Sequence, residues 1–319
     1  MVAVLFIAAF FPGRNDALAQ GQAYKGWPGY DDISDLKECF RNPPKGYGNV
    51  PFYWWTGDPL DIERLGEQLE ILSDASTDGL NVSYNHTDAR VDVELNAPGH
   101  GPCGRVSGGE PRVMSEEWWK IWNEFSAKCA GKGIGLGMDD YVVAWPKNGE
   151  FIDDILNSEP FTKYQGRLVE VKVGNREKKP QTALTMLSRD KDSTAYICTA
   201  PAPWLHPEFG KEIVAKYFQP FVDHMDAEGL KGMNYFFQDE LQYGLELRSW
   251  CEDMPAQFKK RKGYDIVPLL GSLFIDDGAG IDAQAAKVRL DYAEVLTQLS
   301  EERYFKPIYD WNADKGLIY

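Results

Sequence analysis

Short apolar runs alternate along the chain with stretches whose apolar residues recur at helical spacing. The runs at 50–55, 80–84, 134–138 and 233–237 each predict a β-strand. A helical stripe follows every one of them, in one case after an insertion. Strands that alternate with helices indicate right-handed βαβ units, whose strands lie in a parallel sheet.

The helical stripes carry start and stop signals. Ser115 and the two acids after it predict the start of the second helix, and Gly131 predicts its end. Pro220 is expected to kink the third helix and Pro307 to interrupt the fourth, because proline cannot donate to the helical ladder. The stripes run through residues 62–72, 118–129, 214–225 and 288–299.

The segment 160–203 breaks this rhythm with three β-type runs separated by polar turns, which predict a small inserted β-unit. A doubly wound sheet and a barrel both fit the remaining pattern. The first strand is followed by Trp55-Thr56-Gly57-Asp58-Pro59 in place of a glycine-rich phosphate turn, which favours a (β/α)8 TIM-type barrel. Four βα units and a fifth strand after Gly316 predict an incomplete barrel, the N-terminal part of a larger protein.

The first residues differ from the rest of the chain. An apolar run at 2–11 precedes Ala17-Leu18-Ala19, the pattern of a cleaved secretory signal. We therefore expect a signal peptide at 1–19, a partial barrel at 20–319 and a secreted or periplasmic protein. No later apolar stretch predicts a membrane span in the mature form.

Charge and aromatic content narrow the class of ligand. The net charge of −15 argues against a nucleic-acid partner, which requires a basic surface. Ten Trp and sixteen Tyr fit a protein that binds neutral ligands on aromatic surfaces. Five cysteines without a CxxC pair, and histidines without HExxH spacing, give no support to a zinc site.

The predicted strands end abruptly in polar, acidic or aromatic residues, and in a barrel reactive groups lie at these carboxyl ends. Asp239 and Glu240 come after Gln238 at the end of the largely apolar fourth strand. Glycoside hydrolysis needs one acid to protonate the leaving oxygen and a second carboxylate as base or nucleophile. We favour Glu240 as the acid or base and Asp239 as its partner; capping of the next segment, or an arginine partner, remains the structural alternative.

The other strand ends supply candidate substrate contacts. Asp139 and Asp140 predict a site for substrate hydroxyls or for a hard cation. Aromatic side chains near the strand ends predict, as a group, stacking platforms for sugars, although each of them taken alone is more often a core residue. The substrate-binding candidates are Trp54, Trp55, Asn85, His86, Asp139, Asp140, Trp145 and Tyr243.

Several segments together resemble glycoside hydrolase family 106, over roughly residues 39–319. They are CFRNPPKGYGNVPFYWWTGDP, GLGMDDYVVAWPKNG, NYFFQDELQYG, FKKRKGYDIVPLL and the final helix with its glycine. The resemblance implies an inverting α-L-rhamnosidase acting on plant cell-wall polysaccharide, with calcium in the fold. Asp239 and Glu240 fall at the family's acidic motif after strand four. The motif here reads DELQ where the family is closer to DSxE, and family members continue beyond the position of Tyr319.

The sequence thus predicts a secreted glycoside hydrolase domain, α-L-rhamnosidase-like, acting on plant or algal polysaccharide. The alternative is a non-catalytic carbohydrate-binding remnant, which lacks a second carboxylate across the cleft. A metal-dependent hydrolase barrel is a third hypothesis and needs converging His and Asp ligands. The residues themselves require no cofactor, and calcium is the ion that the resemblance implies. The expected partner is an oligo- or polysaccharide.

Overall fold

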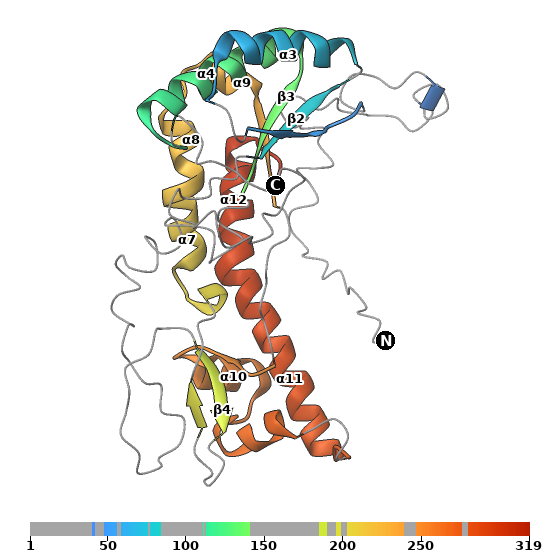
Figure 1. The fold of residues 1–319 in the computed structure, drawn as a ribbon. Coiled ribbons are helices and arrows are strands. Elements are labelled where there is room, and N and C mark those ends of the chain that lie inside the picture. Colours follow the sequence, from blue (N-terminus) through green and yellow to red (C-terminus); the bar gives the residue numbers. More distant parts are fainter. Residues whose placement is uncertain are drawn as a thin grey trace, which may run out of the picture.

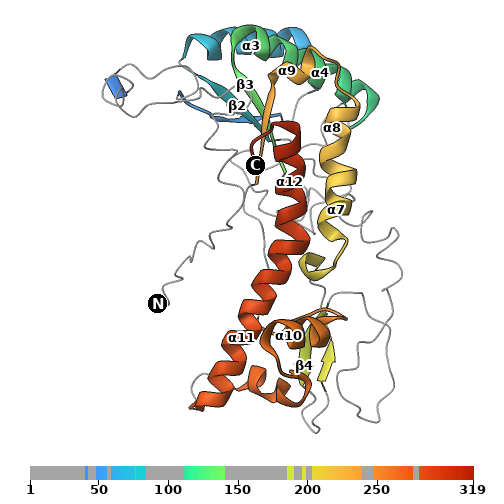
Figure 2. The same ribbon diagram turned by 180° about the vertical axis from the view of Figure 1, so that it is seen from behind.

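The computed structural model describes residues 40–41, 48–55, 59–75, 77–83, 111, 113–140, 185–189, 196–198, 203–238, 247–275 and 280–319. A parallel sheet covered by helices forms one end of the molecule, and a small unit of antiparallel strands and short helices forms the other (Figures 1 and 2). One long helical column, coloured red, runs from the small unit up to the sheet.

The parallel sheet contains β1 (Phe52–Trp54), β2 (Gly79–Ser83), β3 (Gly135–Asp139) and β6 (Met233–Phe237), in that spatial order. Ile318 then pairs with Tyr235 on the open side of β6, also in parallel. Neighbours in space are therefore consecutive along the chain, as in a barrel wall, whereas a doubly wound sheet reverses direction at a switch point. The four predicted strands are found close to their expected positions, and the segment predicted as a fifth strand after Gly316 forms an isolated parallel bridge at Ile318.

Helices α3 (Ile62–Asp74), α4 (Glu116–Lys132) and α9 (Gly229–Gly232) cover one face of this sheet (Figure 1). Ser115 caps α4 by accepting a hydrogen bond from the Trp118 N–H at 3.3 Å, as its position predicts. The helix ends at Lys132, and its cap is Gly133, two residues after the predicted end at Gly131. Gly133 has a left-handed φ of 65°, which is typical of the residue that closes a helix. Trp118 and Trp122 are fully buried, as expected for a core stripe.

Two prolines sit just after widened turns of the helices. The column α7 (Phe209–Ile213), η5 (Val214–Phe218) and α8 (Gln219–Asp223) contains a π-turn directly before Pro220. The column α11 (Ala283–Ser300), η8 (Glu301–Phe305) and α12 (Lys306–Lys315) repeats this arrangement before Pro307. The wider turn accommodates a residue that lacks an N–H, so each helix continues past its proline. The interruption predicted at Pro307 is a local π-bulge within one column.

The small unit is assembled from two separate stretches of sequence. Strands β4 (Thr185–Arg189) and β5 (Tyr196–Cys198) pair antiparallel within the predicted inserted segment. The third strand of that sheet, β7 (Ser249–Trp250), comes from the stretch 248–315, whose sequence predicts mostly helix, so that prediction is wrong at these two residues. A strand of two residues is too short to leave a periodic pattern, and only its pairing with β4 defines it.

Three short helices complete the unit: η4 (Pro203–Leu205), α10 (Met254–Lys262) and η6 (Val267–Phe274). Tyr292 of α11 anchors the unit by donating its hydroxyl hydrogen to the Ser249 carbonyl at 2.7 Å. Cys129 and Cys251 are buried free thiols. Among the helices that the structure describes, none is both long enough and apolar enough to cross a membrane.

Candidate functional site at the carboxyl edge of the sheet

The last side chains of the four strands form a row across the sheet, which we call a rung, on the face opposite the covering helices. Strand register places Trp54 beside Ser83 and Asp139 beside Phe237. The Ser83 hydroxyl donates to Asp139 Oδ2 at 3.0 Å, which joins the two pairs. The rung therefore reads aromatic, hydroxyl, carboxylate, aromatic across the sheet.

The rung below it contains Phe52, Asn81, Gly137 and Tyr235. Gly137 leaves room for the Tyr235 ring, because a Cβ at that position would lie 2.1 Å from its Cε2 atom. The absence of a side chain in the middle of the sheet lets the flanking aromatic rings come together.

The sheet is curved so that its outer strands approach each other on this face. Strands β1 and β6 are three strand spacings apart, about 14 Å in a flat sheet. The rings of Phe52 and Phe237 nevertheless meet edge to face with centroids 5.6 Å apart, and Phe52 stacks on Trp54 at 5.7 Å. Phe52 and Phe237 remain 43% and 40% exposed, so the concave face presents an aromatic surface to solvent.

Asp139 lies under this aromatic surface and is buried. Its carboxylate accepts from Ser83, and its backbone carbonyl accepts from the Tyr217 hydroxyl at 2.8 Å. These bonds fix the end of β3 against η5. Direct contact of Asp139 with substrate hydroxyls stays a prediction.

Asp140 points away from Asp139, because successive side chains of a strand alternate between its faces. Its Oδ2 atom accepts from the Tyr319 hydroxyl at 2.7 Å, and no part of the residue is exposed to solvent. Burial raises the pKa of Asp140 well above its usual range, and the neighbouring charge of Asp139 acts in the same direction. A substrate contact by Asp140 likewise stays a prediction.

Strand β6 brings the predicted acidic pair to this same edge of the sheet. The Asp140 N–H donates to the Phe237 carbonyl at 2.9 Å, so β3 and β6 end side by side. Gln238 follows Phe237, and Asp239 and Glu240 come next in the chain. Both acids lie outside the described residues, as do the other candidates Asn85, His86, Trp145 and Tyr243.

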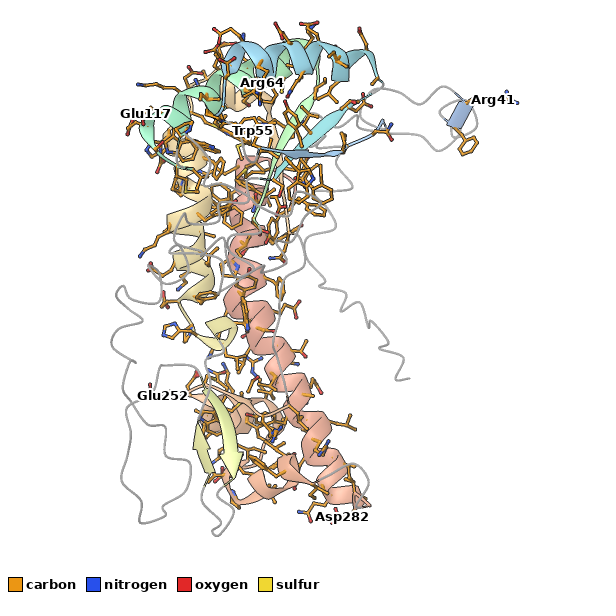
Figure 3. The ribbon with its side chains drawn as sticks, in the orientation of Figure 1. Arg41, Trp55, Arg64, Glu117, Glu252 and Asp282 are labelled. Atoms are coloured by element: carbon orange, nitrogen blue, oxygen red, sulfur yellow. The ribbon has the colours of Figure 1, made fainter. Side chains whose placement is uncertain are left out.

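The two tryptophans of the first strand end on opposite faces. Trp54 is partly exposed on the concave face, where a stacking platform was expected. Trp55 is 3% exposed and packs edge to face on Trp122 and Phe125, beneath α3 and α4 (Figure 3). As it lies here, Trp55 is a core residue and not a sugar platform, and alternation along the strand is the physical reason.

Sequence reasoning missed Phe52 and Phe237 as members of the site. Both lie inside predicted apolar strands, where a phenylalanine ordinarily indicates a buried residue. The period-two alternation shared with Trp54 was the signal that placed Phe52 on the same face.

The described carboxylates do not fit the calcium ion that the family resemblance implies. Calcium takes six to eight oxygen ligands, whereas Asp139 and Asp140 diverge toward different partners. Within the described part of the chain, no group of three or more His, Cys, Asp or Glu side chains is placed to hold a metal ion.

Comparison with known proteins confirms the family resemblance over part of the chain. Residues 205–319 match the profile of the alpha-L-rhamnosidase family, glycoside hydrolase family 106. This stretch includes β6, the acidic pair and the long helical column. A comparison with curated protein sequences found no match.

The fold is similar to that of a rhamnosidase from Novosphingobium sp. PP1Y, with a TM-score of 0.51 at 10% sequence identity. That alignment covers 89% of this chain and 47% of the rhamnosidase, so the chain spans about half the length of that structure. An isomaltulose synthase from Klebsiella sp. LX3 aligns with a TM-score of 0.33 at 13% identity, covering 62% of this chain and 36% of the synthase. The chain therefore has a mixed α/β fold with a parallel sheet, similar to that of the Novosphingobium rhamnosidase, and residues 205–319 match a glycoside hydrolase family.

Proposed function

We propose that this chain, whose residues 205–319 match the alpha-L-rhamnosidase family, is part of the (β/α)8 barrel of an exported glycoside hydrolase. Its substrate would be an α-L-rhamnosyl linkage in plant or algal polysaccharide. The observation that carries the proposal is that β3 and β6 end side by side, with Asp139 and Asp140 at the end of β3 and with Asp239 and Glu240 following Gln238 after β6. Carboxylates gathered at one edge of a curved parallel sheet are what glycoside hydrolysis requires.

In the proposed mechanism, Glu240 transfers a proton at the glycosidic bond. It either protonates the leaving oxygen or takes a proton from the attacking water, and Asp239 orients it. A general acid must keep its proton near neutral pH, which burial at a strand end favours. Asp140, at the end of the neighbouring strand, is an example of this effect, because its burial raises its pKa well above the usual carboxyl range.

The concave aromatic surface is the proposed platform for the sugar. Trp54, Phe52 and Phe237 form one continuous set of ring contacts beside the acidic edge. Such rings bind the apolar face of a pyranose while its hydroxyls remain directed to polar groups. The methyl group at C6 of a rhamnosyl unit adds to the apolar area that this surface can cover.

The direct test is turnover by the 319-residue chain of 4-nitrophenyl α-L-rhamnoside beside 4-nitrophenyl α-L-mannoside. The two substrates differ only by the hydroxyl at C6, and we expect hydrolysis of the rhamnoside to be preferred. NMR of the released sugar reports its anomeric configuration, which the family resemblance predicts to be inverted. Binding of rhamnosyl oligosaccharides without turnover would contradict an enzyme and support the carbohydrate-binding alternative.

Removal of the aromatic platform should weaken substrate binding more than it slows the chemical step. For Phe237→Ala and for Trp54→Ala we expect KM to rise about tenfold, equivalent to ~1.4 kcal/mol, with a smaller change in kcat. Tyr309→Ala is the control, because Tyr309 is an exposed aromatic on α12. A KM unchanged in both platform variants would remove these residues from the substrate site.

A further inference from the structure

Four polar side chains from distant parts of the sequence meet behind the carboxyl edge of the sheet. Asp140 follows β3, Gln238 follows β6, Tyr304 lies in η8 and Tyr319 ends the chain. The Tyr319 hydroxyl donates to Asp140 Oδ2 at 2.7 Å. Gln238 Nε2 donates to the hydroxyl oxygens of Tyr319 and Tyr304, at 2.8 and 3.1 Å. We refer to these four residues as the Asp140 network.

Asp140 is the only carboxyl group in the network, and its surroundings disfavour a negative charge. The residue is 0% exposed, and its Oδ1 atom is buried without a hydrogen-bond partner. The titratable groups that act on it are Asp139 of β3, Tyr217 of η5 and Tyr319, with Tyr304 next to Tyr319; none of these described groups is a cation. Burial penalises the charged carboxylate far more than the protonated carboxyl, and this effect outweighs the hydrogen bonds from Tyr319 and Gln238, which favour the charged form.

The network lies directly before the acidic pair in the chain. Gln238 is its member in the strand-six segment, and the next two residues are Asp239 and Glu240. The Asp140 backbone N–H bonds to Phe237, and the strand at Ile318 bonds to Asn234 and Phe236 on the other side of β6. Whatever holds Gln238 therefore holds the point from which the acidic pair leaves the sheet.

We infer that Asp140 is a positioning residue that acts as a neutral acid, binding Tyr319 and, through it, Gln238, so that three adjacent strand ends are held together at the point in the chain directly before Asp239 and Glu240. The catalytic consequence rests on the proposed function, while the neutral state of Asp140 does not.

The kinetic test compares two replacements of Asp140. Asp140→Asn keeps the shape and the neutral charge, and we expect its kcat to stay within threefold of the parent, with the same pH dependence of kcat/KM. Asp140→Ala and Tyr319→Phe remove the connection, and we expect kcat to fall at least tenfold while KM changes less than threefold. Tyr309→Phe, at an exposed tyrosine of α12, is the matched control for Tyr319→Phe.

An Asp140→Asn variant as slow as Asp140→Ala would overturn the inference, as would a shift of one pH unit in its profile. Either result would show that Asp140 acts through its negative charge. Tyr319→Phe keeps the test decisive if Asp140→Ala fails to fold, because the phenyl ring preserves the packing of the last residue.

Stability against pH tests the neutral state without any substrate. An acid whose pKa is raised in the folded protein loses its proton at a lower pH in the unfolded chain than in the folded one. Ionisation therefore favours the unfolded chain, and the protein loses stability as the pH rises above roughly 4, the pKa of the acid in the unfolded chain. Asparagine has no proton to lose. We therefore expect the Tm values of the two proteins to agree near pH 3.5 and the Asp140→Asn protein to be more stable by a few degrees near pH 7.5.

The two arms separate failure of the inference from failure of the proposed function. A chain that hydrolyses no glycoside but shows the expected Tm difference contradicts the glycosidase proposal and retains a neutral Asp140. An Asp140→Asn protein that is less stable than the parent near pH 7.5 overturns the inference, whatever the activity.

Discussion

Replacement of Glu240 by glutamine is expected to lower kcat for a rhamnosyl substrate by about 10²–10⁴-fold, the usual contribution of a general acid or base. The amide occupies nearly the same volume but cannot transfer a proton, so substrate affinity should change little. Steady-state kinetics and direct binding measurements on the 319-residue chain separate the two effects. Glu67→Gln is the matched control, because Glu67 is an exposed acid on α3.

The choice of leaving group decides which role Glu240 has. If it is the general acid, the loss should be much larger for an alkyl or sugar leaving group than for 4-nitrophenol, which departs without a proton. If it is the general base, both substrates should lose rate equally. Parent-like turnover of both substrates by the glutamine variant would show that Glu240 is not the catalytic residue.

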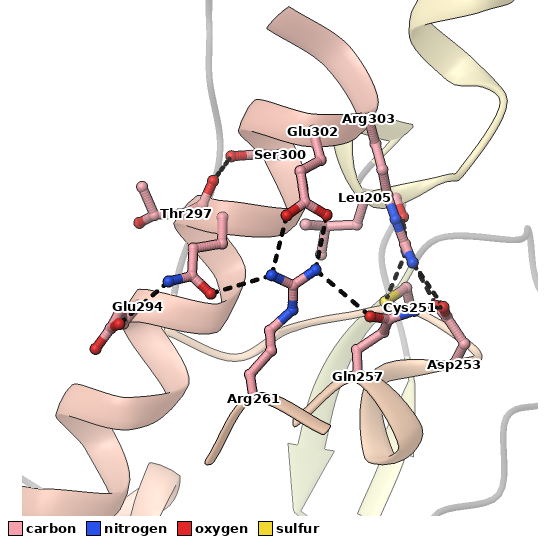
Figure 4. A network of polar contacts seen from close by, with 11 residues as sticks. Leu205, Cys251, Asp253, Gln257, Arg261, Glu294, Thr297, Ser300, Glu302 and Arg303 are labelled. Carbon is pink, nitrogen blue, oxygen red and sulfur yellow. Dashed lines mark hydrogen bonds and ion pairs between the residues drawn. The ribbon is translucent and has the colours of Figure 1, made fainter. Parts of the chain in front are cut away.

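Replacement of Arg303 by alanine is expected to cost about 3 kcal/mol of unfolding free energy. The guanidinium is 9% exposed and makes paired bonds to the Asp253 carboxylate at 3.0 and 2.6 Å, with a third to the Leu205 carbonyl at 2.6 Å (Figure 4). Truncation leaves a carboxylate and a carbonyl without their donor, for which buried pairs lose about 3–5 kcal/mol. Because Asp253 is 38% exposed, the lower end of that range applies.

Urea denaturation measures this loss as a lower midpoint with an unchanged slope. Arg261→Ala is the control: Arg261 binds Glu302 in the same region at 2.7 Å, but Glu302 is 51% exposed. An exposed pair of this kind contributes about 0.2–1 kcal/mol. Equal losses in the two variants would contradict a special role for Arg303.

The Arg303 pair should also depend on pH in a defined direction. Burial alone would raise the pKa of Asp253, but the hydrogen bonds and charge of Arg303 outweigh it and hold the pKa below its usual range. The stability from this pair is therefore present above the unfolded pKa of about 3.9 and is lost as the pH falls through the lower folded value. The difference between the parent and Arg303→Ala should accordingly shrink in acid.

Much of the local structure could be predicted because it depends on neighbouring residues. The strand at 233–237 has the predicted bounds, since a short run with four apolar or aromatic residues out of five, between polar segments, is typical of a buried strand. The start of α4 follows from the hydroxyl of Ser115, a local hydrogen-bond acceptor. The family resemblance, carried by short motifs along the chain, is confirmed over 205–319.

The parts that were missed depend on residues far away in the sequence. Strand β7 exists because β4, more than sixty positions earlier, offers it a backbone partner. Pro307 does not interrupt its helix as predicted, because a π-turn precedes it inside a packed column. Trp54 and Trp55 are neighbouring residues of the same type. Only the packing of α4 against one face of the sheet makes Trp55 a core residue and leaves Trp54 as the platform candidate.

For the candidate site, the sequence by itself determined which residues stand at the strand ends, because an apolar run must stop where the chain leaves the core. It placed Asp139, Asp140, Asp239 and Glu240 after two strands. Only the tertiary structure decided that these two strands are neighbours, that Asp140 is buried against the last residue of the chain, and that Phe52 and Phe237 meet above Gly137. The physical reason is that burial and sheet curvature arise from contacts between distant segments, and those contacts set both the exposure of a ring and the charge of a carboxyl group.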